Sequence, residues 1–146
     1  MDQAFYAFVI LEDAHRFNFV SVGKQLINKT VIFQRIGQTQ FYNLALADIK
    51  DDGTLDVLTV SNNGDTKKIF ATVFQCITNF LQFRPESTIV FMGSTKERTN
   101  IYHWLICRNL EKARLNFLLY GYTDGYFETF NPEACYESFA ISLKNY

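Results

Sequence analysis

Hydrophobic residues repeat with one spacing in the first sixty residues of the chain and with a different spacing from Ile69 onward. In the first part, Phe17, Phe19 and Ser21 alternate with Asn18, Val20 and Val22, which is the period of a strand whose two faces differ. From Ile69 to Phe80, apolar residues recur every three or four positions, which is the period of an amphipathic helix. A chain that carries both patterns in this order is expected to build a sheet and to cover it with helices. The sequence therefore predicts the α+β class.

Turn residues such as Gly23-Lys24 and Asp51-Asp52-Gly53 separate the predicted elements. The predicted strands cover residues 17–22, 25–36, 41–49, 55–60, 88–92, 115–120, 126–130 and 139–143, and the predicted helices cover 69–80 and about 95–112. We expect a single domain over residues 1–146 with a mainly antiparallel sheet of about six to eight strands and two helices packed on one face. Its order is β-β-β-β-α-β-α-β, with one or two closing strands.

Composition and charge exclude several classes of protein. Hydrophobic residues make up 48% of the chain and charged residues 20%, which excludes a disordered chain. The formal net charge of −1 gives no overall basic field of the kind that drives unspecific nucleic-acid binding. The apolar run near the N-terminus ends at Leu11, so it is too short to span a membrane, and it has no basic flank typical of a signal. We therefore predict a cytoplasmic protein with no membrane partner.

The cysteines, histidines and acidic residues form no recognisable metal or cofactor motif. The three cysteines are Cys76, Cys107 and Cys135. Their odd number and wide spacing fit neither a disulfide framework nor a metal site, so we interpret them as reduced thiols, with Cys76 and Cys107 in the core. The two histidines, His15 and His103, lie far apart in the chain. The acidic cluster Asp48, Asp51, Asp52 and Asp56 is typical of a hairpin turn rather than a calcium loop. We predict no metal and no cofactor.

Basic residues on the predicted helices leave a local nucleic-acid patch open. They are Lys67, Lys68, Lys96, Arg98, Arg108, Lys112 and Arg114. Tyr102, Trp104 and Tyr120 could supply stacking surfaces for single-stranded RNA. A solvated helix face is the simpler interpretation of the same residues, so nucleic acid is not the partner that we predict.

Two places pass from a predicted strand through a short polar turn into a predicted helix. In the first, Ser61-Asn62-Asn63-Gly64-Asp65, the Asp65 carboxylate could cap the helix. In the second, Gly93-Ser94-Thr95, either hydroxyl could act as the cap, and Glu97 has the spacing of a capping box with Ser94. If the strands before both turns are parallel neighbours, the two helix N-termini meet at one edge of the sheet. Free backbone N–H groups and positive dipole ends there would suit a phosphate or another anion, and Gly93 would allow close backbone approach.

Arg98 strengthens this hypothesis because a cation is unfavourable in the first turn of a helix. Its guanidinium needs a compensating anion, which could be Asp65, Asp56, Glu97 or a bound phosphate or carboxylate. The alternative interpretation is purely structural. In that case both turns are simple caps, and Arg98 pairs with a carboxylate of the chain.

Several stretches in the middle of the chain carry a resemblance. They are Asp51-Asp52-Gly53-Thr54-Leu55-Asp56, Thr59-Val60-Ser61-Asn62-Asn63-Gly64-Asp65, Lys67-Lys68-Ile69-Phe70-Ala71-Thr72-Val73, and Gly93-Ser94-Thr95 with Arg98-Thr99 and Tyr102. In these stretches the chain resembles an uncharacterised family of small bacterial proteins. Relatives have a second acidic residue after the position of Asp56, where this chain has Val57, which weakens a catalytic role for two carboxylates. The resemblance implies no activity, but it is concentrated at the two turns.

We take as candidate ligand-binding residues Asn62, Asn63, Asp65, Lys68, Ser94, Thr95, Arg98 and Tyr102. The function predicted first is a binding or regulatory module that holds a small anion or nucleotide there, with Arg98 as its clamp. One alternative is a protein-interaction module, such as a toxin–antitoxin or phage-defence component, which uses the aromatic hairpin at 120–130; a homodimer stays open. The other is an enzyme acting on a phosphodiester, with Asp65 as base, Lys68 or Arg98 stabilising charge and Tyr102 positioning the substrate.

Overall fold

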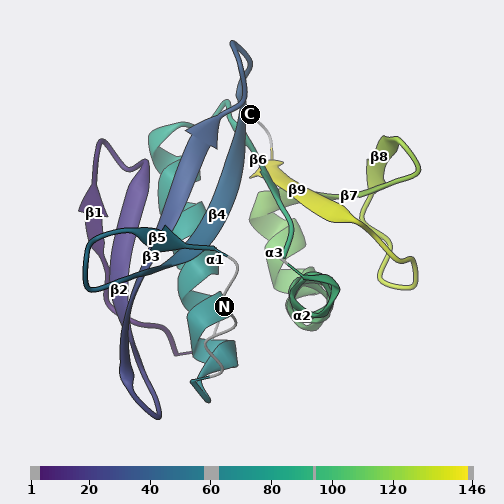
Figure 1. Ribbon diagram of the computed structural model, residues 1–146. Coiled ribbons are helices and arrows are strands. Elements are labelled where there is room, and N and C mark those ends of the chain that lie inside the picture. Colours follow the sequence, from purple (N-terminus) through teal and green to yellow (C-terminus); the bar gives the residue numbers. More distant parts are fainter. Residues whose placement is uncertain (1–3, 58–62, 94, 145–146) are drawn as a thin grey trace.

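The computed structural model describes residues 4–57, 63–93 and 95–144, which form one mostly antiparallel sheet of nine strands with three helices (Figure 1). The strands are β1 (Val9–Leu11), β2 (Arg16–Val22), β3 (Leu26–Arg35), β4 (Phe41–Ile49), β5 (Leu55–Asp56), β6 (Thr88–Phe91), β7 (Phe117–Thr123), β8 (Tyr126–Thr129) and β9 (Ser138–Leu143). The helices are α1 (Thr66–Phe83), α2 (Lys96–Arg108) and α3 (Leu110–Asn116). The predicted α+β class is confirmed.

The strands follow the order β1-β2-β3-β4-β6-β9-β7-β8, and the short β5 also pairs with β4. Every pair is antiparallel except β4 with β6, which run parallel. β6 pairs with β4 only along Phe41–Asn43, whereas β5 pairs with Asp48 and Ile49 at the other end of the same edge. The edge of β4 between these two stretches is therefore not paired with either strand.

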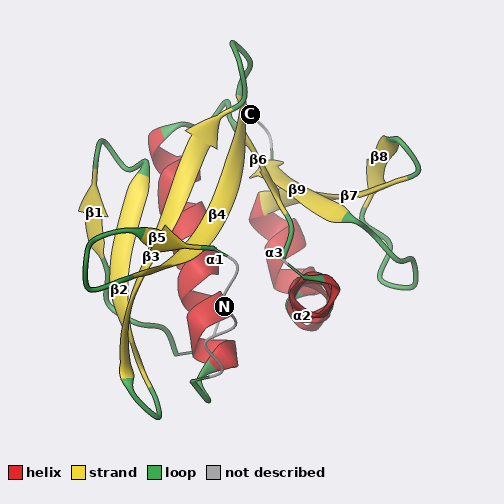
Figure 2. Cartoon of the chain, viewed as in Figure 1, coloured by secondary structure: helices red, strands yellow, loops and turns green. Residues whose placement is uncertain are grey.

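All three helices pack on one face of the sheet (Figure 2). Phe91, Leu119 and Ile141 point to that face, and they line one apolar gap together with residues of α1, α2 and α3. Against the first half of the sheet, the Phe80 ring of α1 stacks on Phe33 with ring centroids 4.3 Å apart. Offset and edge-to-face aromatic pairs of this kind stabilise a core beyond the area that they bury. Much of the high aromatic content of the chain is thus used inside the domain.

The second half of the core is built around Tyr102 of α2. Its ring packs edge-on against Phe70 of α1, with centroids 4.6 Å apart, and lies 5.1 Å from Phe91 of β6. Burial raises the pKa of the Tyr102 hydroxyl well above its ordinary value. Tyr102 therefore joins both long helices to the sheet.

Several predictions about the elements are corrected. The sheet has nine strands rather than six to eight, because β1 is a three-residue edge strand with no alternation of its own. The predicted strand over residues 55–60 ends at Asp56, and residues 58–60 lie outside the described part. The predicted second helix is divided at Asn109, whose side-chain Nδ2 donates to the Leu105 carbonyl at 2.8 Å. The strand predicted from Leu115 begins at Phe117, because α3 continues to Asn116.

The environment of the cysteines differs along the chain. Cys76 is fully buried in α1, as predicted, and burial raises the pKa of its thiol strongly. The prediction for Cys107 is corrected, because this residue is only half-buried on α2 and packs against the core from its edge, and Cys135 is exposed. Among the helices that the structure describes, none is long and apolar enough to cross a membrane.

Candidate functional site

The first turns of α1 and α2 line one cavity of about 340 Å³, which we call the helix-start cavity. It is lined by Lys29 and Leu46 from the sheet, by Asn63, Thr66, Ile69 and Phe70 at the start of α1, and by Thr95, Glu97, Arg98 and Ile101 at the start of α2. The strands before the two turns were predicted to be parallel neighbours. This is wrong, because β5 and β6 run in opposite directions beside β4. The two helix N-termini nevertheless lie beside the same cavity.

A second hollow of about 400 Å³ lies next to it and shares Leu46, Phe70 and Arg98. It opens along the part of β4 from Asn43 to Leu46, and Asn43 is the last residue of this stretch that pairs with β6. Arg98 lies between the two hollows, because its side chain lines both.

Gly93, at the end of β6, allows α2 to begin close to the strand. A Cβ atom at this position would lie only 2.4 Å from the Arg98 Cβ and from the Thr99 nitrogen. The Gly93 N–H also donates to the Thr99 hydroxyl at 3.1 Å. The group that lies close to the Gly93 backbone is thus the first turn of α2 itself, and approach of an anion to Gly93 stays a prediction.

Thr95 is the cap of α2. Its hydroxyl oxygen accepts a hydrogen bond from the Arg98 backbone N–H at 3.2 Å, which satisfies one of the unpaired donors of the first turn. With Thr95 as cap, the third helical residue is Arg98, so Glu97 is not at the capping-box position of this cap, and its predicted pairing with Ser94 depends on a residue outside the described part. Ser94 lies outside the described residues.

Asp65 does not cap α1 with its side chain, which corrects the prediction. Its Oδ2 instead accepts from the Ser21 hydroxyl at 2.5 Å and from the Tyr6 hydroxyl at 2.5 Å. Burial, followed by the hydrogen bond to Asp65, raises the pKa of Tyr6 above its ordinary value. The first turn of α1 holds Lys67 and Lys68 and no acidic residue. Among the described residues, the N-terminus of α1 therefore has no side-chain cap from Asp65 and no acidic residue in its first turn.

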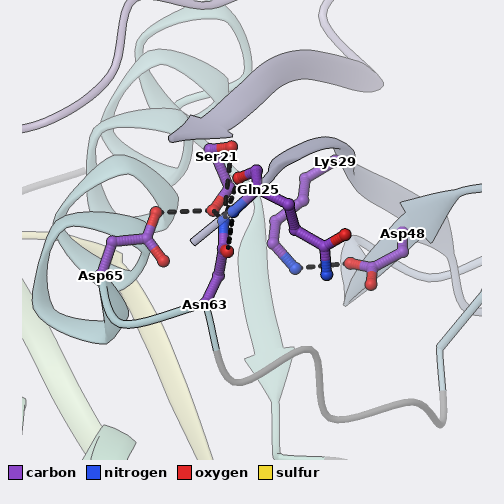
Figure 3. Close-up of polar contacts among 6 residues, drawn as sticks. All are labelled: Ser21, Gln25, Lys29, Asp48, Asn63 and Asp65. Atoms are coloured by element: carbon purple, nitrogen blue, oxygen red, sulfur yellow. Dashed lines mark hydrogen bonds and ion pairs between the residues drawn. The ribbon is translucent and has the colours of Figure 1, made fainter. Parts of the chain in front are cut away.

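Asn63 lines the helix-start cavity, but its side chain is occupied by the β2–β3 hairpin (Figure 3). Its Nδ2 donates to the Gln25 carbonyl at 2.8 Å and to the Ser21 hydroxyl at 2.9 Å, and its Oδ1 accepts from the Gln25 N–H at 2.9 Å. Only 3% of Asn63 is exposed. The residue fixes the hairpin to the start of α1, which is a structural role.

Lys29, which the sequence analysis did not select, forms part of the cavity wall. It is 2% exposed, and its ammonium group pairs with Asp48, the residue opposite it on β4 (Figure 3). Lys29 occupies an inward position of β3, between Ile27 and Val31, and Asp48 occupies an inward position of β4. A lysine and an aspartate on the inward faces of adjacent predicted strands were the signal that could have revealed this pair.

The remaining candidates lie elsewhere. Lys68 places its ammonium 4.4 Å from the centroid of the Tyr6 ring rather than in the cavity, and Tyr102 lines the second hollow. Asn62 lies outside the described residues. The cavity thus brings together Asn63, Thr95 and Arg98 from the predicted set, and it excludes Asp65, Lys68 and Tyr102.

The acidic cluster of residues 48–56 has local partners. Asp52 accepts from the Thr54 N–H at 3.0 Å and from the Thr54 hydroxyl at 2.6 Å, which closes the turn before β5. Asp56 lies 3.9 Å from the Lys50 ammonium. In the parts of the chain that the structure describes, no group of three or more His, Cys, Asp or Glu side chains is arranged to hold a metal ion.

A family model matches residues 2–144, which is nearly the whole chain. The chain belongs to DUF6934, a family of unknown function. No curated protein and no solved structure matches the chain. The expectation of an uncharacterised family is therefore confirmed for DUF6934, whereas the bacterial source and the particular motifs stay predictions.

The aromatic hairpin of this DUF6934 chain lies far from the helix-start cavity in the strand order, at the β8 edge of the sheet. Tyr126 and Phe127 of β8 are exposed, and the turn before them holds Asp124 and Gly125 with positive φ values of 51° and 90°. The predicted turn between β7 and β8 is confirmed. A protein partner at this hairpin stays a prediction.

Proposed function

We propose that the chain is a binding module that holds a small anionic molecule, of phosphate or nucleotide type, in the helix-start cavity. The observation that carries this proposal is that the first turns of α1 and α2 line the cavity together with Arg98. Backbone N–H groups of a first helical turn lack partners within the helix and point toward an approaching anion.

The start of α1, which the Asp65 side chain does not cap, offers backbone N–H groups to the anion. Asp65 is turned toward Ser21 and Tyr6, so an oxygen of the ligand would accept from the N–H groups that the carboxylate leaves. The guanidinium of Arg98 would donate to the same anion, as a charge-assisted hydrogen bond from the second helix.

The rest of the cavity suits a ligand with an apolar body. Leu46, Ile69, Phe70 and Ile101 form apolar wall, and the volume of about 340 Å³ falls within the range of small-molecule sites. The positive charge of Lys29 adds little to the attraction of an anion into the cavity, because Asp48 pairs with this lysine. A mononucleotide or a phosphorylated metabolite therefore fits better than inorganic phosphate alone.

The enzyme alternative receives less support from this arrangement. The candidate base, Asp65, is not part of the cavity wall, and its Oδ2 already accepts two hydrogen bonds. A binder needs no general base, so the cavity is sufficient for binding without catalysis.

A thermal-shift series tests the proposal. Inorganic phosphate, mononucleotides and simple carboxylates are each added to the wild type, to Arg98→Ala and to Arg108→Ala, which removes an exposed arginine of the same helix. A ligand at a hundred times its Kd stabilises the folded state by about 2.7 kcal/mol, which raises Tm by about 5 to 10 °C for a chain of this size. We expect this rise with a phosphate-bearing compound in the wild type and Arg108→Ala, and its loss in Arg98→Ala. No rise with any anion, or an equal rise in Arg98→Ala, would contradict the proposal.

A further inference from the structure

The charges of the chain are divided between the helices and the rest of the molecule. The three helices carry seven basic residues, Lys67, Lys68, Lys96, Arg98, Arg108, Lys112 and Arg114, and two acidic ones, Glu97 and Glu111. The helices therefore have a net charge of +5, and the remaining residues have −6, which together give the −1 of the whole chain. The helical layer is a basic surface on a chain that is nearly neutral overall.

Trp104 lies exposed on this basic surface. It is the only tryptophan of the chain, and 41% of it is exposed. The ammonium of Lys67 on α1 lies 5.3 Å from the centroid of its ring, and the guanidinium carbon of Arg108 lies 4.8 Å from it. Both cations lie over the indole ring, so a base that stacks on Trp104 displaces one of them from the ring face and brings its phosphate next to it.

An open hollow of about 800 Å³ between α1 and α3 adds hydrogen-bonding groups to the same layer. Its polar lining includes Gln75 and Gln82 from α1, Asn116 from α3, and the basic residues Lys112 and Lys144. No acidic side chain lines it in the described part of the chain. Carboxamides both donate and accept, so they can reach the edges of bases that are not paired.

We propose that the helical layer binds single-stranded nucleic acid, with a base stacked on Trp104 and the neighbouring phosphates held by Lys67 and Arg108. The favoured partner is single-stranded because a base in a duplex cannot leave its stack to lie on Trp104 without being unpaired. An acidic peptide would match the charge but would make no use of the indole plane or the carboxamides. The site is separate from the helix-start cavity, whose lining does not include Trp104, Lys67 or Arg108.

The single tryptophan makes stacking directly measurable. The full chain is titrated with twelve-residue oligo(U) and oligo(dT), and the fluorescence of Trp104 is followed. We expect quenching that saturates, with an affinity that falls steeply as salt rises. Comparing the two oligomers shows whether the 2′-hydroxyl contributes. Polyglutamate and a duplex of the same length are the controls.

Variants identify the site through the anisotropy of a labelled oligomer. Trp104→Leu is expected to weaken binding by about tenfold, since stacking on an aromatic side chain contributes that order of affinity per base. Arg108→Gln is expected to lower the salt dependence by about one phosphate contact, whereas Arg35→Gln, which removes an exposed charge at the end of β3, is the matched control and is expected to do neither. Circular dichroism of each variant checks that it is folded.

Several results would overturn the inference. They are the absence of binding to either oligomer, binding without quenching of Trp104, equal binding of polyglutamate or of the duplex, and equal effects of Arg108→Gln and Arg35→Gln. Equal binding of polyglutamate would instead assign the surface to acidic partners in general.

Discussion

At the scale of single residues, the wall of the helix-start cavity contains a buried ion pair. Lys29 and Asp48 face each other across β3 and β4, and Lys29 is almost fully removed from solvent. A charge in such a place is costly unless it is paired, because the interior solvates it poorly. The pair therefore couples the stability of the sheet to the shape of the cavity.

Replacing Asp48 alone should be more harmful than replacing both partners. We expect Asp48→Leu to lower the free energy of unfolding by about 3 kcal/mol, because it removes the carboxylate that pairs with the buried Lys29 ammonium. The double variant Lys29→Met with Asp48→Leu should lose clearly less than the sum of the single changes. Urea denaturation of the four proteins in a double-mutant cycle measures the coupling.

The pair of the exposed Lys50 and the partly buried Asp56 provides the control for this cycle. Its atoms lie 3.9 Å apart at the surface, so Lys50→Ala should change stability by less than about 0.5 kcal/mol. Additive effects in the Lys29–Asp48 cycle would contradict the importance assigned to the buried pair.

The sequence alone was sufficient for some site residues and not for others. The Thr95 cap and the position of Arg98 on the cavity wall could be predicted, because both depend on the first turn of one helix. The role of Asp65 could not, because its competing donors, Ser21 and Tyr6, lie far away in the chain and reach it only in the folded sheet. The role of Asn63 was missed for the same reason. Its side chain was predicted to bind a ligand, whereas it binds the backbone of Gln25, which lies far away in the chain.

At the scale of elements, α1 and α2 begin in different ways. α2 has a threonine cap whose hydroxyl oxygen accepts from Arg98, whereas α1 has no side-chain cap. Both helix starts line the same cavity. We therefore expect a bound anion to accept hydrogen bonds from the first N–H groups of α1, because the Asp65 side chain does not accept them.

Thr95→Ala should lower the free energy of unfolding by about 1 kcal/mol, because a first-turn N–H of α2 then loses its acceptor. Thr66→Ala is the matched control. Thr66 is the first residue of α1 rather than its cap, so its replacement should change stability by less than about 0.5 kcal/mol. Chemical denaturation compares the two variants, and equal losses would show that the Thr95 cap contributes nothing special.

The spacing of apolar residues predicted the long elements. It did not predict the break between α2 and α3 or the direction of β6. α1 was predicted because apolar residues keep a spacing of three and four from Ile69 to Phe80, and the observed helix, Thr66–Phe83, extends beyond this stretch at both ends. The break between α2 and α3 was missed because Leu105, Ile106 and Leu110 continue the helical pattern across Asn109. An asparagine side chain that bonds to the carbonyl one turn earlier competes with the backbone of the helix, and periodicity does not detect this. The direction of β6 relative to β5 depends on long-range pairing with β4, which local patterns do not contain.

At the scale of the whole molecule, burial of tyrosine hydroxyls makes stability depend on alkaline pH. Tyr6, Tyr102 and Tyr136 all have pKa values raised above the ordinary 10.0, with burial as the main cause. Each raised pKa means that the folded state keeps its proton when the unfolded chain loses it. The contribution is therefore complete below about pH 10 and is lost as pH rises toward the folded-state value.

We expect the free energy of unfolding to fall above pH 10, by up to about 1.4 kcal/mol per pH unit for each of these tyrosines. Tyr102→Phe keeps the buried ring and removes the ionising group, so it should make this decline shallower. Urea denaturation between pH 8 and pH 11.5 measures both proteins. A stability that stays level or rises over this range would contradict the assignment.

The division of charge also belongs to this scale, because it places a basic helical layer on a chain with a net charge of −1. We propose different anions for the two sites: a small molecule in the helix-start cavity and an extended single strand on the surface around Trp104. Their separate variants, Arg98→Ala and Arg108→Gln, allow either function to fail without the other.

Backbone amide NMR shows whether the first turns of α1 and α2 bind one anion together. The ¹⁵N-labelled chain is titrated with a mononucleotide and with inorganic phosphate, and the amide signals are followed. We expect saturable shifts of the amides of residues 66–69 and 96–99 in the wild type, and their absence in Arg98→Ala. Shifts confined to other parts of the chain, or no shifts at ligand concentrations up to about 10 mM, where binding would be weaker than a typical metabolite site, would contradict this expectation.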